Sequence, residues 1–158
     1  MTVVSDRSTL ATAQISRVDG QISGLEVKSV HRLRSSSGKH LKGRINDSEG
    51  LAIAPDGTIY ISFEGVSRVV RHTTASNRAE VLPRPTEFRT LPKNKALESL
   101  AIDAQVNLYT LPETALNTDG QIPVWRWNGK AWFPPFTLPT QGGPFYTSPS
   151  QRSQKRNS

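Results

Sequence analysis

The sequence has 158 residues, with no cysteine and no long apolar run. The absence of cysteine excludes disulfide bonds and thiolate metal ligands. A membrane-spanning helix needs about 18 consecutive apolar residues, and none occurs. The first nine residues, MTVVSDRST, lack the charged region and apolar core of a signal peptide. The sequence also lacks a G-x-S-x-G motif and a glycine-rich phosphate loop, so it has neither the usual nucleophile elbow nor a P-loop.

The composition is that of a single domain that is poor in apolar residues and basic. Hydrophobic residues make up 35% and charged residues 21%, and the formal net charge is +7. A basic charge is compatible with nucleic-acid binding, but here the lysines and arginines are scattered, and three lie in the last seven residues. We therefore expect a solvated basic surface, with no nucleic-acid and no membrane partner.

Short apolar runs separated by turn residues predict an all-β fold. Asp19-Gly20 and Asn128-Gly129 are typical hairpin turns, and no segment shows helical periodicity over three turns. The proline-rich segment 84–95 is predicted to be a long loop. Residues 144–158 are predicted to form a disordered basic and polar tail, after a domain at 1–143. The expected strands are 2–4, 10–18, 25–33, 51–54, 58–63, 67–72, 78–82, 100–102, 108–111, 124–127 and 131–133.

An internal repeat relates two parts of the chain at an offset of 49 residues. SEGLAIAPDGTIYISFEG at 48–65 aligns with LESLAIDAQVNLYTLPET at 97–114, and the alignment pairs Glu49 with Glu98 and Glu64 with Glu113. Four short strands fit into each unit, as in a β-propeller blade. The alternative is a chance match between two hairpins. The chain has room for about three four-stranded antiparallel blades, a partial propeller, so we expect self-association through unclosed blade edges.

The stretches DSEGLAIAPDGTIYISFEG, ALESLAIDAQVNLYTLPE, VSDR and PVWRWNG together resemble the phytase-like family, also described as esterase-like activity of phytase, a bacterial β-propeller family. The resemblance implies metal-assisted hydrolysis of a small ester or phosphoester. It also suggests a periplasmic or secreted protein, although no signal peptide is present. Family members usually have more blades, so we expect this chain to be a truncated copy with little activity of its own.

Carboxylates at the ends of inner propeller strands are the candidate site. Glu49 and Glu98 occupy equivalent positions and are the candidate catalytic acids. Glu64 and Glu113 form a second set, which Asp6 joins because Val4-Ser5-Asp6 resembles Ser62-Phe63-Glu64. Converging carboxylates suit a hard cation, foremost Ca²⁺, that activates water and polarises the substrate. The alternative is structural: the repeated acids accept backbone hydrogen bonds and hold neighbouring blades together.

Two further residues complete the candidate set. Asp47 is a candidate metal ligand or, alternatively, the cap of the turn before a strand. Arg7 is a candidate for binding an anionic substrate group, or an ordinary surface arginine. Two functions therefore stay open at this point: a fragment of a hydrolytic propeller, and a non-catalytic propeller fragment or interaction module.

Overall fold

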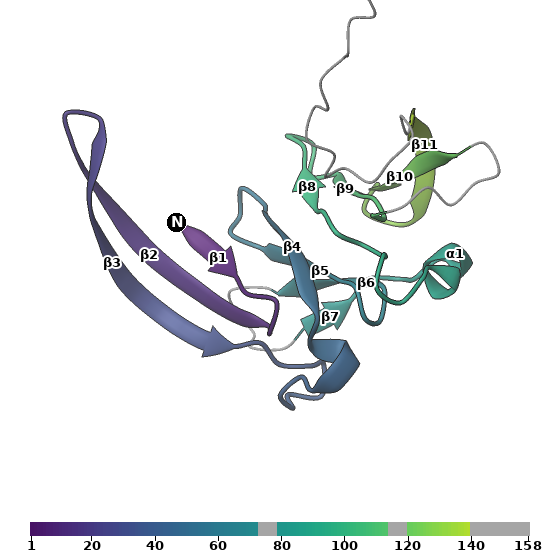
Figure 1. Cartoon of the computed structure of the whole chain (residues 1–158), viewed down its shortest axis with the longest axis horizontal. Helices are drawn as coiled ribbons and strands as arrows, with labels where there is room; N and C mark the ends of the chain where they lie inside the picture. The colour runs from purple at the N-terminus through teal and green to yellow at the C-terminus, as the bar shows by residue number, and fades with distance from the viewer. Residues whose placement is uncertain (73–78, 114–119, 140–158) are drawn as a thin grey trace, which may run out of the picture.

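The structure, a computed structural model, describes residues 1–72, 79–113 and 120–139. In these residues the chain forms three antiparallel sheets that follow one another along the sequence (Figure 1). The predicted all-β class with three sheets is confirmed. None of the helices in these ranges is long and apolar enough to cross a membrane. The predicted tail at 144–158 lies outside the described residues.

The first sheet has three strands in the order β1 (Thr2–Val4), β2 (Thr9–Val18) and β3 (Gln21–Arg32). The long β2–β3 hairpin forms the curved arm at the left of Figure 1. Its turn has positive φ angles at both Asp19 (51°) and Gly20 (78°), as a two-residue hairpin turn requires. The expectation of four strands is wrong for this sheet, because β1 is its edge and pairs with β2 alone.

The second sheet is a four-stranded meander. Its strands are β4 (Ser48–Ile53), β5 (Ile59–Phe63), β6 (Arg68–His72) and β7 (Ala79–Val81), and each pairs with the next along the chain. A short 3-10 helix, η1 (Gly43–Asn46), leads into β4. This sheet lies between the other two in Figure 1. Its four strands in sequence order agree with the predicted four-stranded unit.

The third sheet repeats this order. It consists of β8 (Ala101–Ile102), β9 (Leu108–Thr110), β10 (Gln121–Trp127) and β11 (Trp132–Pro139), joined as a meander. The two-residue β8 is much shorter than β4, and the pairing of β10 with β11 contains a bulge. The edge strands β8 and β11 therefore differ in length, although the strand order is the same as in the second sheet.

The segment 84–95 is not a loop throughout, as predicted, because it contains the helix α1 (Thr86–Thr90). Phe88 on this helix is 1% exposed, and its ring lies 5.4 Å from the ring centroids of both Trp125 and Trp132. Burying a large aromatic side chain stabilises a structure by about 1.5–3 kcal/mol. A helix of one turn shows no sequence periodicity, so tertiary packing rather than local pattern determines it.

Two apolar cores lie between the three sheets. The tryptophans Trp125 and Trp127 pack in the core between the second and third sheets. Val69 and Tyr60 of the second sheet contact the same core. The core between the first and second sheets contains Leu10, Leu33, Ile61, Phe63, Val70 and Ala79.

The face of the β2–β3 hairpin that points away from the second sheet is aliphatic. Leu10 faces the second sheet, so alternate residues of β2 point outward, among them Ala11, which is paired with Val30. Val27 and Val30 are 59% and 63% exposed, and no described residue covers them. A sheet face of this kind is normally packed against another layer.

Candidate metal centre

The acidic residues of the second sheet lie at the end where β4 begins and β5 ends. Ser48 pairs with Phe63, so Glu49 on β4 and Glu64 just after β5 lie at the same end of the hairpin. The backbone N–H of Glu64 donates to the carbonyl of Asp47 over 3.0 Å. Antiparallel pairing thus places three carboxylates, those of residues 47, 49 and 64, at one end of the sheet.

The same arrangement occurs 49 residues later. Leu97 bridges Pro112, which brings Glu98 and Glu113 to one end of the β8–β9 hairpin. The backbone N–H of Glu113 donates to the carbonyl of Ala96 over 3.1 Å, as Glu64 does to Asp47. The third sheet therefore contributes two carboxylates, because alanine occupies the position that corresponds to Asp47.

A glycine lets the two hairpins approach each other. A Cβ atom on Gly50 would lie 2.6 Å from the backbone nitrogen of Leu100 and 2.6 Å from the Oγ of Ser62. Real Cβ atoms do not approach other atoms so closely. Only glycine at this position therefore lets β4 approach Leu100, the residue directly before β8. The Gly50 N–H also donates to the Ser62 hydroxyl over 2.8 Å. This contact places β4, which carries Glu49, next to β8, which follows the segment that carries Glu98.

The carboxylates form two groups of three that could hold a metal ion. In each group, one carboxylate oxygen from every member lies within 4.8 Å of the others. None of the five members is ion-paired with a lysine or arginine anywhere in the described ranges. Oxygen-only ligands of this kind fit a hard divalent cation such as Ca²⁺. The groups are Asp47, Glu49 and Glu64, and Glu64, Glu98 and Glu113.

Glu64 belongs to both groups and connects the two sheets. Its Oε1 accepts a hydrogen bond of 3.3 Å from the backbone N–H of Ala96, in the segment that leads to Glu98. Its carboxylate also shares a hydrogen bond with the Glu98 side chain. Because Glu64 lies between Glu49 and Glu98, the two groups form one continuous acidic cluster. We call Asp47, Glu49, Glu64, Glu98 and Glu113 the acidic cluster.

The cluster changes the protonation of two of its members. Burial is the largest cause of a raised pKa at Glu98; together with the hydrogen bond and negative charge of Glu64 and the charges of Glu49 and Glu113, it brings this pKa to about 7. The pKa of Glu49 is also raised, first by burial and then by the charges of Asp47, Glu64 and Asp6. Carboxyl groups with raised pKa values can hold a proton near neutral pH, as general acids do.

Two arginines hold the loops that carry the cluster. Arg44 donates from Nη2 to the carbonyl of Gly65 over 3.0 Å, and Arg68 donates from Nη2 to the carbonyl of Ile45 over 2.7 Å. Arg68 also donates from Nη1 to the carbonyl of Val66 over 3.0 Å. These bonds join the loop before Asp47 to the loop after Glu64. This role cannot be predicted from the sequence, because backbone carbonyl partners leave no pattern in a sequence.

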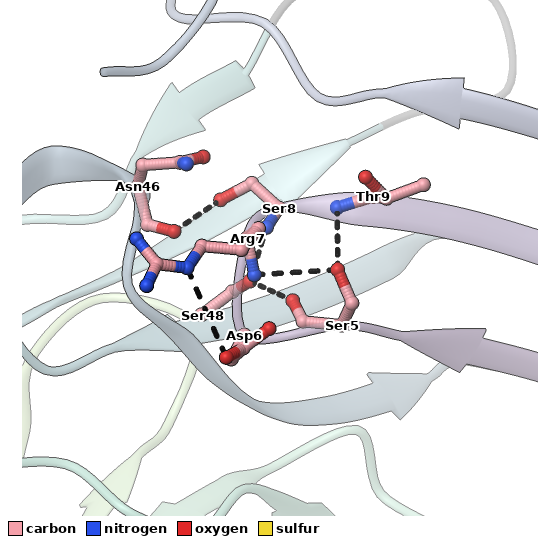
Figure 2. A network of polar contacts seen from close by, with 7 residues as sticks. All are labelled: Ser5, Asp6, Arg7, Ser8, Thr9, Asn46 and Ser48. Atoms are coloured by element: carbon pink, nitrogen blue, oxygen red, sulfur yellow. Dashed lines mark hydrogen bonds and ion pairs between the residues drawn. The ribbon is translucent and has the colours of Figure 1, made fainter. Parts of the chain in front are cut away.

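Asp6 and Arg7 lie beside the acidic cluster rather than in it. They occupy the turn between β1 and β2, and Figure 2 shows their ion pair, with 3.9 Å between Arg7 Nε and Asp6 Oδ2. Both side chains are largely exposed, at 83% for Arg7 and 72% for Asp6. The charge of Asp6 nevertheless contributes to the raised pKa of Glu49. The predicted ligand Asp6 therefore acts on the cluster through its charge.

A serine network fixes this turn against the second sheet (Figure 2). The buried hydroxyl of Ser48 accepts a hydrogen bond of 3.1 Å from the Ser8 N–H and donates to the carbonyl of Ser5 over 2.6 Å. The Ser8 hydroxyl donates to the carbonyl of Asn46 over 3.0 Å. Ser8 has a φ of 54°, which aims its N–H at β4. In the sequence, Ser5 and Ser48 stand directly beside Asp6 and Glu49.

Aspartates other than Asp47 cap the turns inside the two hairpins. Asp56 Oδ1 accepts the Thr58 N–H over 2.9 Å, and Asp103 Oδ1 accepts the N–H groups of Gln105 and Asn107. Both are side-chain turns of the kind that favours aspartate. The carboxylate of Asp47 belongs instead to the acidic cluster.

The chain also matches a known protein family. The family model described as "Phytase-like: Esterase-like activity of phytase" matches residues 1–145. The chain belongs to this phytase-like family. The match covers the three sheets and all the candidate residues, and it ends two residues beyond the predicted domain limit of 143. A comparison with curated proteins gives no match.

Proposed function

We propose that the acidic cluster of this phytase-like chain binds a divalent cation, foremost Ca²⁺, and serves the hydrolysis of a small ester or phosphoester. The observation that carries the proposal is the convergence of five carboxylates from two sheets without a lysine or arginine partner in the described residues. Unpaired carboxylates at such distances repel one another, and a bound cation removes this repulsion. The family match supports the hydrolytic part of the proposal.

The members of the acidic cluster have different proposed roles, which depend on whether each carboxyl group is protonated. Asp47, Glu64 and Glu113 would hold the cation, together with Glu49 and Glu98 when these two are ionised. A bound cation supplies polarisation of the substrate oxygen and a lowered pKa of water. Glu98, with a pKa raised to about 7, holds a proton in a substantial fraction of molecules at neutral pH. It is our candidate for delivering a proton to the leaving group, and Glu49 for accepting one from water.

Arg7 is proposed to bind an anionic group of the substrate at the edge of the cluster. Its guanidinium group is largely exposed and has a single ion-pair partner, Asp6. An exposed arginine offers several hydrogen-bond donors to a carboxylate or phosphate. Since solvent screens such a contact, we expect Arg7→Ala to weaken substrate binding modestly and to leave the chemical step unchanged.

Hydrolysis of p-nitrophenyl acetate and p-nitrophenyl phosphate, with Ca²⁺ and with a chelator, tests the proposal. Because the chain is expected to be a truncated copy, we expect low turnover, which depends on Ca²⁺ and is lost in Glu49→Gln and Glu98→Gln. Glu87→Gln on the exposed side of α1 is the matched control and should retain full turnover. Calcium binding without turnover would favour the second candidate, a non-catalytic propeller fragment. The absence of both calcium binding and turnover would refute the metal site.

The second candidate, a non-catalytic propeller fragment, is supported by the exposed aliphatic face of the β2–β3 hairpin. Val27 and Val30 on this face are more than half exposed. The expected self-association through open sheet edges remains a prediction. Sedimentation equilibrium over a range of protein concentrations tests it. A monomer at all concentrations would contradict it.

A further inference from the structure

A cavity of about 130 Å³ lies between the second sheet and the segment that leads from β3 to β4, on the opposite side of β5 and β6 from the tryptophan core. Its floor is one face of the second sheet, because Phe63 pairs with Arg68 and Val70 pairs with Val81. Its wall is the segment after β3 together with η1, from which Leu41 and Ile45 respectively project apolar side chains. The remaining lining residues are Arg34, Ser35, Ser36, Val66, His72 and Ala79.

The body of this cavity is suited to an apolar group of limited size. Phe63 is fully buried and Val70 is 2% exposed, and neither offers a hydrogen bond from its side chain. An aliphatic cavity of ~150 Å³ in another protein admits a benzene molecule. A single ring or a short aliphatic chain therefore matches the available volume.

One end of the cavity carries a buried positive charge. Arg68 is 7% exposed, and its guanidinium carbon lies 3.8 Å from the centroid of the Phe63 ring. Its hydrogen bonds go to the backbone carbonyls of Ile45 and Val66, and no carboxylate among the described residues forms an ion pair with it. Burial of this charge, with repulsion from Arg84, lowers the pKa of Arg68 to about 10. Such a charge is costly to bury unless an anion compensates it.

The other polar side chains leave the charge of Arg68 uncompensated. His72 has a pKa below its ordinary value, because it is buried and because His31 lies nearby, so it is neutral at pH 7. Arg34 is exposed at the rim and donates from Nη1 to the carbonyl of Gly38 over 2.9 Å. The cavity thus combines an apolar body, a cationic end and a cationic rim.

We propose that this cavity binds a small apolar anion, namely a single ring or short chain that carries a carboxylate or phosphate group. The apolar part lies over Phe63 and Val70, and the anionic oxygens accept hydrogen bonds from the guanidinium donors of Arg68 that the backbone carbonyls leave free. A charge-assisted bond to arginine is stronger than a neutral one. This site is distinct from the acidic cluster, whose charges repel anions, and it does not depend on the proposed hydrolysis.

Ligand-observed NMR and calorimetry with benzoate and phenyl phosphate test the proposal, with a chelator present so that no cation in the acidic cluster bridges to the anion. The neutral isostere benzamide separates the role of the charge from that of the apolar body. We expect saturable binding of benzoate or phenyl phosphate, with benzamide at least about tenfold weaker. The preferred anion identifies which head group the site accepts. Equal binding of benzamide and both anions, or no saturable binding of either anion, would overturn the proposal.

Two variants assign the binding to this cavity. Arg68→Met keeps the length and apolar contacts of the side chain and should weaken anion binding by about tenfold or more. Because Arg68 also holds two loops, Ala79→Leu provides an independent test: it fills the cavity from β7 and should abolish binding in a protein that circular dichroism shows to be folded. Ala13→Leu on the outward face of β2 is the matched control and should bind as the unaltered chain does. Unchanged binding by Ala79→Leu would refute the assignment.

Discussion

The β4–β5 and β8–β9 hairpins have the same backbone pairing but different side chains. Ala52 pairs with Tyr60, and 49 residues later Ala101 pairs with Tyr109. The turns also match: the N–H of residue 57 donates to the carbonyl of residue 54, and the N–H of residue 106 to that of residue 103. The positive φ of this turn falls on Gly57 (84°) in one hairpin and on Val106 (64°) in the other.

The two hairpins show which features of the acidic cluster depend on backbone pairing and which depend on individual side chains. The shared pairing puts Glu49 and Glu98 at matching ends of their hairpins. The side chains then make the hairpins unequal, because Asp47 in the first corresponds to Ala96 in the second, and Gly50 corresponds to Ser99. The acidic cluster is therefore a consequence of matching backbones, and its asymmetry arises from single substitutions.

The largest expected change in stability is that caused by a substitution of Gly50. Gly50→Ala places a Cβ 2.6 Å from the backbone nitrogen of Leu100, which cannot move without shifting the third sheet. We expect a loss of about 3 kcal/mol in the free energy of unfolding, measured by urea denaturation. Ser99→Ala is the control at the matching position and should change stability by less than about 0.5 kcal/mol. Equal effects of the two variants would contradict the close approach of the hairpins.

The turn residues should respond in opposite directions. Val106→Gly removes a β-branched residue from the left-handed region and should stabilise the chain by about 1 kcal/mol. Gly57→Val introduces the same conflict in the other hairpin and should destabilise it by about 1–2 kcal/mol. Thermal unfolding of the two variants measures both changes. Changes of the same sign would show that the two turns are not equivalent.

The smallest expected effect is the pH dependence caused by Glu98. Its folded-state pKa of about 7 is above the ordinary value of 4.5, so the folded chain binds this proton more tightly than the unfolded chain. The associated stability is present at low pH and is lost as the pH rises through about 7. In Glu98→Gln, the free energy of unfolding measured by urea denaturation should decrease less between about pH 5 and about pH 8. A variant with the same slope as the original chain would exclude Glu98 as its cause.

The sequence was sufficient to predict the sheets and the positions of the acids, because alternation and turn residues act over a few neighbours. The 49-residue repeat pairs Glu49 with Glu98, and the structure places each of them at the matching end of its hairpin. It could not predict α1, since this one-turn helix depends on Phe88 packing against Trp125 and Trp132. It also missed the cavity around Arg68, because the loop that covers it contacts the sheet through residues distant in the sequence.

The central claim is that Glu64 joins the carboxylates of two sheets into one cation site. Calorimetric titration with Ca²⁺ of the full chain, of Glu64→Gln and of the control Glu87→Gln tests it most directly. We predict that the original chain and Glu87→Gln bind Ca²⁺ alike, and that Glu64→Gln loses binding at least about tenfold, because both groups of three lose a ligand. Equal Ca²⁺ binding by Glu64→Gln and the original chain, or no binding by either, would contradict the account.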